Sequence, residues 1–517
     1  MDRLSRLPLH PIFFTTYPIL ALLATNIVEV EIQIAVRPLL ISLAGTVIVL
    51  LVVRLILKDW RKAALVTTLL LILFFSYGHL YQFIRKTPIF GVNVGRHRYL
   101  IVAYSALLLI GLWWILGKLK DIPMATQLLN VVGLVLLIYP SFQIFNFFSQ
   151  ASTGERVSAD LASISNPLIV PESGDIPDIY YIILDTYTRA DALLNDFGFD
   201  NSPFLDELSA MGFFVADCSR CNYIFTQGSL TSALNLEYLP ELQRTLADRS
   251  LGANDIWVLM KNSLVRKQLE AIGYKTVAFD TGYEWSRISD ADIYLGLASN
   301  PFGLQILQPF EAMLIKSTAG LILTDTQNKL LAARFKEINF PYSGFANRQL
   351  FILDQLLKIP SISGPKFVFV HILIPHVPRV FGPQGEILTD TGFYGGEKAE
   401  AINDDYFRRG YVGEIIFLNN RMLDIVGTIL AQSTTPPIII IQGDTGCKGN
   451  NFLIINAYYL PGEGSAKLYS TITPVNTFRV IFDTYFGTSY SLLPDESFHS
   501  DDLKNSVPET SPACISE

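Results

Sequence analysis

Two aspartates and two histidines stand at or near the ends of apolar runs, where they could bind a metal ion or assist a reaction. Asp185 ends DIYYIILD (178–185), Asp444 ends PPIIIIQGD (436–444), and His371 and His376 lie in and directly after KFVFVHILIP (366–375). Short, continuous apolar runs are typical of strands that are buried on both faces of a parallel sheet. Ligands of such sheets bind beyond the carboxyl ends of the strands, so we expect these side chains to lie near a ligand site.

A fifth candidate, Thr226, directly precedes a predicted helix from about Gln227 to Tyr238. The N–H groups and the dipole at the start of a helix favour an anion, so a threonine there is well placed for phosphate chemistry. Alone, Thr226 is more simply a helix N-cap, and either aspartate alone is more simply a structural carboxylate. Together, two carboxylates and a hydroxyl can bind a hard divalent cation beside a nucleophile.

The elements that must position these residues alternate between strands and helices from Asp178 onward. Further strands are predicted at 213–217, 274–280 and 452–462, and helices at 202–212, 405–433 and 476–487. This alternation predicts an α/β/α sandwich around a largely parallel sheet. We assign residues 178–490 to this domain and 491–517 to a polar tail.

The first part of the chain has the composition of a membrane protein. Half of the 517 residues are hydrophobic and 17% are charged, and the mean hydropathy is +0.35. About five apolar segments approach the ~20 residues that a helix needs to cross a bilayer; they fall at 11–28, 39–57, 63–84, 99–117 and 124–146. Residues 1–146 are therefore predicted to form a helical bundle, which the polar segment 147–177 links to the outer domain.

The short loops of this bundle indicate its orientation. With the N-terminus inside, eight Lys and Arg residues lie on the cytoplasmic side and five on the other, as the positive-inside rule requires. An odd number of spans then places the C-terminal domain outside the cytoplasm at the cell membrane. The net charge of −8 and the lack of a basic stripe argue against a nucleic-acid partner.

Four cysteines, all in the outer part of the chain, are compatible with one or two disulfide bonds outside the cell. Cys218 and Cys221 form a CxxC, and Cys447 and Cys514 are isolated. The CxxC is either a redox or metal pair, or two small buried residues or an incidental bridge. No second CxxC is present to complete a zinc site.

Several of these segments, taken together, resemble the alkaline phosphatase/sulfatase superfamily. The resemblance is to its membrane-anchored, sulfatase-like branch, to which lipoteichoic acid synthases and phosphoethanolamine transferases are related. It covers about residues 178–490 and rests on YYIILDTYTR (180–189), GFDNSPFLDELSAMGFFVAD (198–217), Thr226-x-x-Ser229, FVFVHILIPHVP (367–378), IIIIQGDTG (438–446) and NAYYLPG (456–462). In the bundle, RPLLISL (37–43) and DWRKAAL (59–65) are also similar to that branch.

The resemblance implies an alkaline phosphatase-like fold and a role for each candidate. Asp185 and Asp444 are then metal ligands, and Thr226 is a nucleophile that also contacts a Mn²⁺, Mg²⁺ or Zn²⁺ ion. His376 binds the transferred group or the leaving oxygen. His371 either supports it or is a strand histidine satisfied by its neighbours, and Thr231 is a weaker alternative nucleophile more than a turn into the helix.

One departure from the family's pattern concerns the metal site. Members usually carry Asp-His-Gly after the last core strand, with both Asp and His on the metal, whereas this chain has Asp444-Thr445-Gly446. A threonine hydroxyl is a weak ligand compared with imidazole, so we expect Thr445 to leave the metal more weakly bound. Cys447 is a candidate replacement, and no histidine is an obvious one. The segment from Asp444 to NAYYLPG is also shorter than the branch usually has.

Two functions remain open on these grounds. The first is metal-dependent transfer of a phospho group, or cleavage of a phosphodiester, on a membrane lipid or envelope glycan substrate through Thr226. True sulfatases of the superfamily need a Cys or Ser in a Cys/Ser-x-Pro-x-Arg context, and neither the Cys nor the Pro-x-Arg is present here. The second is a catalytically degraded member that binds a ligand or partner in the old cleft. A transporter is a weak third hypothesis, because no charged residue lies mid-span and no repeat is visible.

Overall fold

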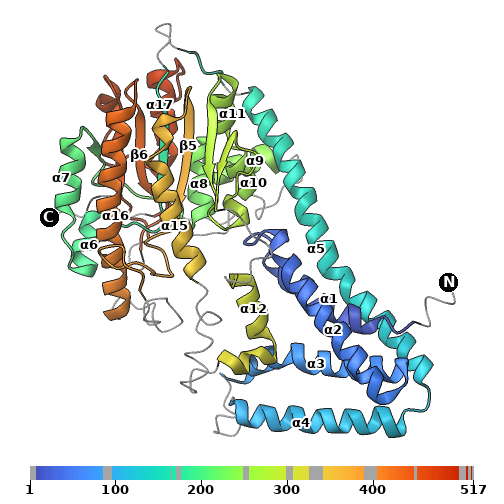
Figure 1. Ribbon diagram of the computed structural model, residues 1–517. Coiled ribbons are helices and arrows are strands. Elements are labelled where there is room, and N and C mark those ends of the chain that lie inside the picture. The colour runs from blue at the N-terminus through green and yellow to red at the C-terminus, as the bar shows by residue number, and fades with distance from the viewer. Residues whose placement is uncertain are drawn as a thin grey trace. The chain divides into compact units, whose positions relative to one another are not determined.

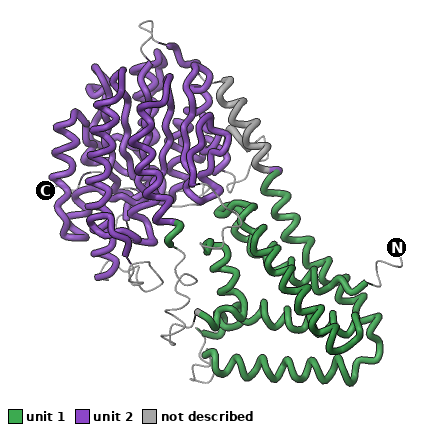
Figure 2. Tube along the Cα trace, viewed as in Figure 1, with its two compact units in different colours: residues 1–148, 299–344 green, residues 149–298, 345–517 purple. Residues whose placement is uncertain are grey.

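The computed structural model describes residues 7–85, 96–164, 166–170, 176–247, 256–297, 307–324, 342–388, 405–447, 451–499, 508–509 and 514. The chain divides into two compact units, one of residues 1–148 and 299–344 and the other of residues 149–298 and 345–517 (Figure 2).

The first unit contains the apolar helices, as the sequence predicts (Figure 1). They are α1 (His10–Thr25), α2 (Val36–Leu57), α3 (Trp60–Arg85), α4 (His97–Trp113) and the start of α5 (Ile122–Ile164). Four segments of the described chain are long and apolar enough to cross a membrane: Ile32–Leu57, Trp60–Arg85, His97–Lys118 and Ile122–Ser149. The first of the five expected spans corresponds to α1, which is apolar but has only 16 residues. Helix α5 continues to Ile164, into the range that the sequence assigned to the linker.

A segment from the middle of the chain also belongs to the first unit, although the sequence assigned it to the outer domain. Helix α12 (Pro309–Ser317) and the 3-10 turn η6 (Ala319–Thr324) lie within residues 299–344. Glu311 of α12 forms an ion pair with Arg37 of α2, and the Arg37 Nε donates to the Glu311 Oε1 at 2.6 Å. Gly78 of α3 allows the backbone of α12 to come close, since a Cβ at Gly78 would stand 2.3 Å from the carbonyl oxygen of Lys316.

The second unit contains the α/β domain. Its strands are β1 (Ile179–Leu184), β2 (Phe214–Val215), β3 (Lys275–Phe279), β4 (Ile293–Leu295), β5 (Lys366–Ile372), β6 (Ile438–Gly443) and β7 (Asn456–Tyr459). Its helices include α6 (Ala190–Phe197), α7 (Ser202–Ala210), α8 (Thr226–Asn235), α9 (Leu239–Ala247), α10 (Ile256–Lys261), α11 (Leu264–Ala271), α15 (Ser343–Leu356), α16 (Asp405–Gln432) and α17 (Pro474–Tyr485).

The seven strands form one mixed sheet in the order β2-β7-β6-β1-β5-β3-β4. The central strand β1 is parallel to both β5 and β6, and β7 is antiparallel to β6 and to β2. Every residue of β1, β5 and β6 is buried, as expected for strands covered on both faces. The predicted, largely parallel sheet is therefore confirmed, and β4 is an additional short strand that the sequence did not indicate.

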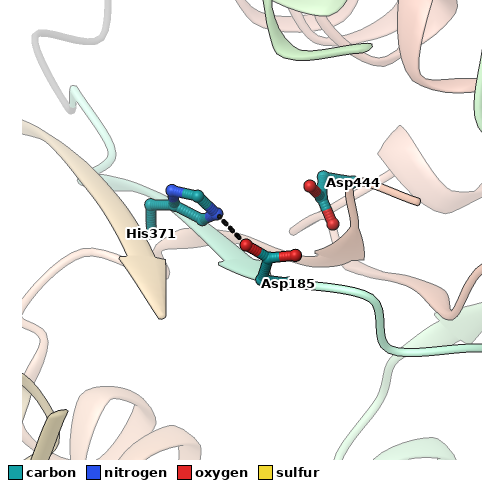
Figure 3. Close-up of side chains that lie close together, drawn as sticks. All are labelled: Asp185, His371 and Asp444. Carbon is teal, nitrogen blue, oxygen red and sulfur yellow. Dashed lines mark ion pairs between the residues drawn. The ribbon is translucent and has the colours of Figure 1, made fainter. Parts of the chain in front are cut away.

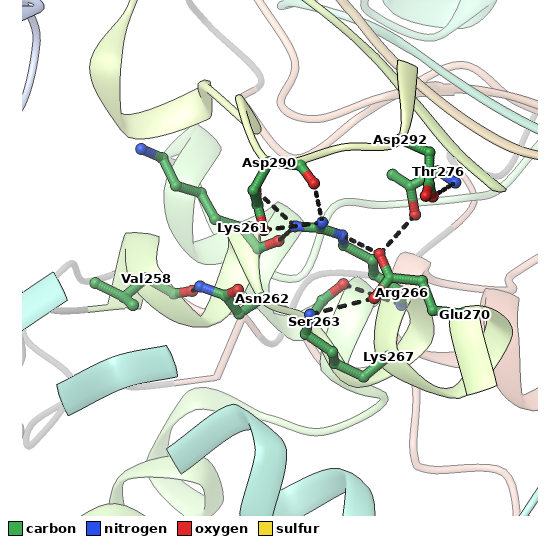
Figure 4. A network of polar contacts seen from close by, with 10 residues as sticks. All are labelled: Val258, Lys261, Asn262, Ser263, Arg266, Lys267, Glu270, Thr276, Asp290 and Asp292. Carbon is green, nitrogen blue, oxygen red and sulfur yellow. Dashed lines mark hydrogen bonds and ion pairs between the residues drawn. The ribbon is translucent and has the colours of Figure 1, made fainter. Parts of the chain in front are cut away.

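Packing and ion pairs fix the helices around this sheet. On one face, Phe478 of α17 packs edge-on against Tyr181 of β1, with 5.2 Å between ring centroids. Helices α15 and α16 run alongside the strands (Figure 1). Helix α11 is held by Arg266, whose guanidinium pairs with Glu270 of the same helix and with Asp290 (Figure 4).

The end of the chain crosses the segment that leads into α8. The backbone N–H of Phe498 donates to the carbonyl oxygen of Asn222 at 2.9 Å, and the Phe498 ring stacks on that of Tyr223. A disulfide bond joins Cys218 to Cys514, 296 residues further on. Cys218 is thus bonded outside its own CxxC, and Cys221 is a buried thiol that contributes to no disulfide.

Candidate active site

Three side chains from the central strands converge at one edge of the sheet. Asp185 follows β1 and Asp444 follows β6, and the register pairs Leu184 with Gly443, so the two carboxylates leave the sheet at the same level. His371 of β5 pairs with Ile183 of β1. Ile183 lies two residues before Asp185, and side chains two residues apart on a strand project from the same face. One ligand atom of each of Asp185, His371 and Asp444 lies within 4.8 Å of the others (Figure 3).

The three side chains are buried and short of hydrogen-bond partners. The His371 Nε2 lies 3.4 Å from the Asp185 Oδ2. The Asp185 Oδ1, the Asp444 Oδ2 and both ring nitrogens of His371 have no hydrogen-bond partner in the described part of the chain. Buried polar atoms without a partner are costly in a folded protein. Two carboxylates and an imidazole are also the donor types that Zn²⁺ and Mn²⁺ accept. These residues therefore fit a divalent metal ion.

Asp444 is held in place by the loop that follows β1. Its Oδ1 accepts the backbone N–H of Thr186 at 2.9 Å and that of Thr445 at 2.7 Å. Burial raises the pKa of Asp444, and the neighbouring charge of Asp185 raises it further, while His371 and the Thr226 hydroxyl lower it. Two carboxylates this close and this buried are expected to repel each other, and a cation between them relieves that repulsion.

Thr226 is the first residue of α8, where the sequence predicted a position directly before the helix. Its hydroxyl is near enough to Asp444 to lower the pKa of that carboxyl group, and its side chain is half-buried. Thr231 is fully buried and its hydroxyl donates to the carbonyl oxygen of Ile256. Of the two threonines, Thr226 is the more exposed.

The other predicted site residues lie outside this cluster. His376 is exposed, and its Nδ1 lies 2.7 Å from the carbonyl oxygen of Val377. Thr445 is buried next to Asp444. Cys447 is buried as well, but it is not one of the three clustered residues.

Sequence reasoning found no obvious histidine to replace the missing Asp-His-Gly histidine, and it gave His371 a minor role. In the structure, His371 supplies an imidazole to the cluster. The signal for this was present in the sequence, because His371 lies inside its apolar run whereas His376 follows it. An inward-facing strand histidine aligned with the strand-end aspartates can only be recognised once the strands are aligned with one another.

The comparisons with known proteins find solved structures that are similar to this chain. No family model matches the chain, and no curated protein matches it. The structure is similar to the zinc complex of the periplasmic domain of EptC from Escherichia coli, with 12% identity and a TM-score of 0.42, over 66% of this chain and 95% of that one.

Two further solved structures cover different shares of the chain. The lipooligosaccharide phosphoethanolamine transferase A of Neisseria meningitidis, an integral membrane protein, is 12% identical with a TM-score of 0.36, over 92% of this chain and 94% of that one. A 2-O GAG sulfatase is 11% identical with a TM-score of 0.36, over 61% and 72% of the two chains. Because these values are low, the function proposed below is drawn from the site itself.

Proposed function

We propose that this protein is a membrane-anchored, metal-dependent enzyme that transfers or hydrolyses a phospho group through Thr226. The observation that carries the proposal is the cluster of Asp185, His371 and Asp444, with unsatisfied donor atoms, beside a threonine at a helix N-terminus. The resemblance of the sequence to sulfatase-like transferases points in the same direction. In this proposal His371 supplies the imidazole that the related motif would place at position 445, where this chain has a threonine.

The chemistry can be assigned to the residues of this chain. The Thr226 Oγ attacks the phosphorus of a phosphodiester, its proton passes to solvent, and the bond from phosphorus to the leaving alcohol breaks as that alcohol gains a proton. Water or an acceptor hydroxyl then attacks the phosphothreonine and frees Thr226. A bound divalent ion would supply charge stabilisation for the transferred group. The N–H groups at the start of α8 favour the same negative charge.

The membrane unit indicates the class of substrate. An enzyme anchored by apolar helices, with its α/β domain outside the cytoplasm, meets lipids and envelope glycans more often than soluble metabolites. We therefore propose a membrane lipid or lipid-linked envelope glycan as donor or acceptor. The disulfide between Cys218 and Cys514 supports an extracytoplasmic domain, because such bonds persist in oxidising compartments.

The rival function is ligand or partner binding by a catalytically degraded site. Thr445 favours it, because a hydroxyl replaces the usual imidazole next to Asp444. His371 weighs against it, because the cluster still offers an imidazole and two carboxylates.

The test is hydrolysis of a chromogenic phosphodiester by the full chain in detergent, with Mn²⁺, Mg²⁺ or Zn²⁺ added. We expect Thr226→Ala to lower the metal-dependent rate by about 10³-fold or more. His371→Ala should weaken metal affinity by about tenfold or more, measured by isothermal titration of the metal-free protein. Thr231→Ala is the control for a threonine in the same helix.

Two results would decide against the proposal. One is a rate that Thr226→Ala leaves unchanged, which would exclude this threonine as the nucleophile. The other is an inactive wild type that becomes active as Thr445→His, which would mean that the cleft persists but its chemistry was given up.

A further inference from the structure

A buried arginine near the candidate site has no acceptor for its N–H groups among the residues that the structure describes. Arg379 follows β5 by seven residues and is 3% exposed. In the described part of the chain its guanidinium makes no hydrogen bond and no ion pair, and its buried Nε has no partner. A charged group in this state costs free energy unless something pairs with it.

The other buried arginines of the described chain are satisfied. Arg266, also 3% exposed, donates to Glu270, Asp290 and the carbonyl oxygen of Lys261 (Figure 4). Arg189 pairs with Asp191, and Arg479 donates to the carbonyl oxygens of Leu236 and Ser491. Of these four buried arginines, Arg379 is therefore the one that makes no hydrogen bond or ion pair within the described chain.

Aromatic rings hold Arg379 without using its donors. Its Cζ lies over the ring of Phe407 at 4.2 Å and over that of Tyr411 at 5.3 Å from the ring centroids. The five N–H groups of a guanidinium lie in its plane, so contacts over ring faces leave the donors for a planar or tetrahedral oxyanion. The segment itself is fixed, because the N–H groups of Val380 and Phe381 donate to the Glu414 Oε1.

Tyr411 connects this arginine to the candidate site. Its hydroxyl donates to the carbonyl oxygen of Thr186 at 2.6 Å and accepts the backbone N–H of Thr188 at 3.0 Å. Thr186 in turn donates its N–H to Asp444. A single tyrosine thus separates the guanidinium from the loop that carries Asp185 and holds Asp444.

We propose that Arg379 is an anion-binding residue that pairs with the phosphate group of the substrate and orients it towards Thr226. The identity of the anion rests on the proposed function, whereas the unpaired, buried guanidinium does not. Burial raises the pKa of Glu414 to about 8, although the nearby charge of Arg379 lowers it, so this carboxyl group only partly offsets the charge of Arg379 at pH 7.

The experiment measures inorganic phosphate binding to the full chain in detergent by thermal shift, at constant ionic strength and pH 7. Wild type should gain thermal stability with phosphate. Arg379→Met should raise the apparent Kd for phosphate by about tenfold or more, because a charge-assisted pair is lost. Arg379→Lys keeps the charge but loses the planar, forked set of guanidinium donors, and should give an intermediate Kd. Arg409→Met, which removes an exposed arginine of α16, should leave the Kd within about twofold of wild type.

The apo protein gives a second readout. If the guanidinium is unpaired, Arg379→Met should match or exceed the phosphate-free stability of wild type. A phosphate Kd within about twofold of wild type in Arg379→Met and Arg379→Lys would overturn the proposal and make Arg379 a packing residue. Thr226→Ala should still bind phosphate through Arg379. A wild type that binds phosphate but shows no metal-dependent turnover would therefore count against the proposed function and not against this site.

Discussion

At the scale of single residues, the proposed metal site draws its imidazole from His371 of β5 and not from position 445, which is a threonine. In the superfamily that the sequence resembles, an imidazole usually follows the aspartate at the position of Asp444, whereas this chain has Thr445. The β5 histidine brings an imidazole nitrogen to within 4.8 Å of both aspartates from a different strand. A donor set is a matter of where atoms meet in space, and its members need not be neighbours in the sequence.

Glu414 gives a prediction about pH at the same scale. Burial raises its folded-state pKa to about 8, above the usual ~4.3 of a glutamate in an unfolded chain. The folded protein therefore binds one more proton than the unfolded chain between these values. Its contribution to stability is fully present below about pH 4.3 and is lost as the pH rises through about 8, by up to ~1.4 kcal/mol per pH unit.

Glu414→Gln removes this titration while keeping an oxygen for the Val380 and Phe381 N–H groups. We expect the variant to be more stable than wild type at pH 8.5 and to differ least from it at pH 5. Chemical denaturation at both pH values measures this. An equal difference between the two proteins at both pH values would mean that Glu414 does not titrate in this window.

At the scale of elements, the close approach of α12 to α3 depends on a glycine. A Cβ at Gly78 would stand 2.3 Å from the Lys316 carbonyl oxygen and 2.4 Å from the Ser317 carbonyl carbon, and backbone cannot move aside as a flexible side chain can. Gly78→Ala should therefore lower the melting temperature of the purified protein, despite the better helix propensity of alanine. A loss of about 1–3 kcal/mol is expected for such overpacking.

Gly45 of α2 provides the matched control, because a Cβ there meets nothing within 4 Å. Gly45→Ala should leave stability unchanged or raise it by up to about 1 kcal/mol. If Gly78→Ala and Gly45→Ala melt alike, the packing of α12 on α3 is looser than described.

The elements also show what the sequence could and could not predict. Strands β1, β5 and β6 were predicted because each is a continuous apolar run, and their end residues were recognised for the same reason. Strand β4 has only three residues, too few to give a pattern. The grouping of α12 with the membrane unit was missed, because PFEAMLIKS has an ordinary mixed composition. Its place is identified by partners far away in sequence, among them Arg37 and Gly78.

At the scale of the whole molecule, the disulfide bond between Cys218 and Cys514 links two distant parts of the chain. It closes a loop of 296 residues, so its loss should cost about 2–4 kcal/mol of unfolding free energy. Cys514→Ser should lower the melting temperature of the full chain, and a reducing agent should lower that of wild type by a similar amount. The variant itself should not respond to the reducing agent. Equal melting of oxidised and reduced wild type would show that the disulfide bond adds nothing to stability.

The insertion of residues 299–344 into the second unit has a consequence for the order of events during synthesis. Central strand β1 is made before the insertion, whereas β5 and β6, its partners on both sides, are made after it. While the ribosome produces residues 299–344, β1 has no neighbour in the sheet and its six buried residues have no cover. Such a strand is open to pairing with other chains. Until β6 emerges, protection of this half-made sheet depends on chaperones or on the helices of the same unit that are already made.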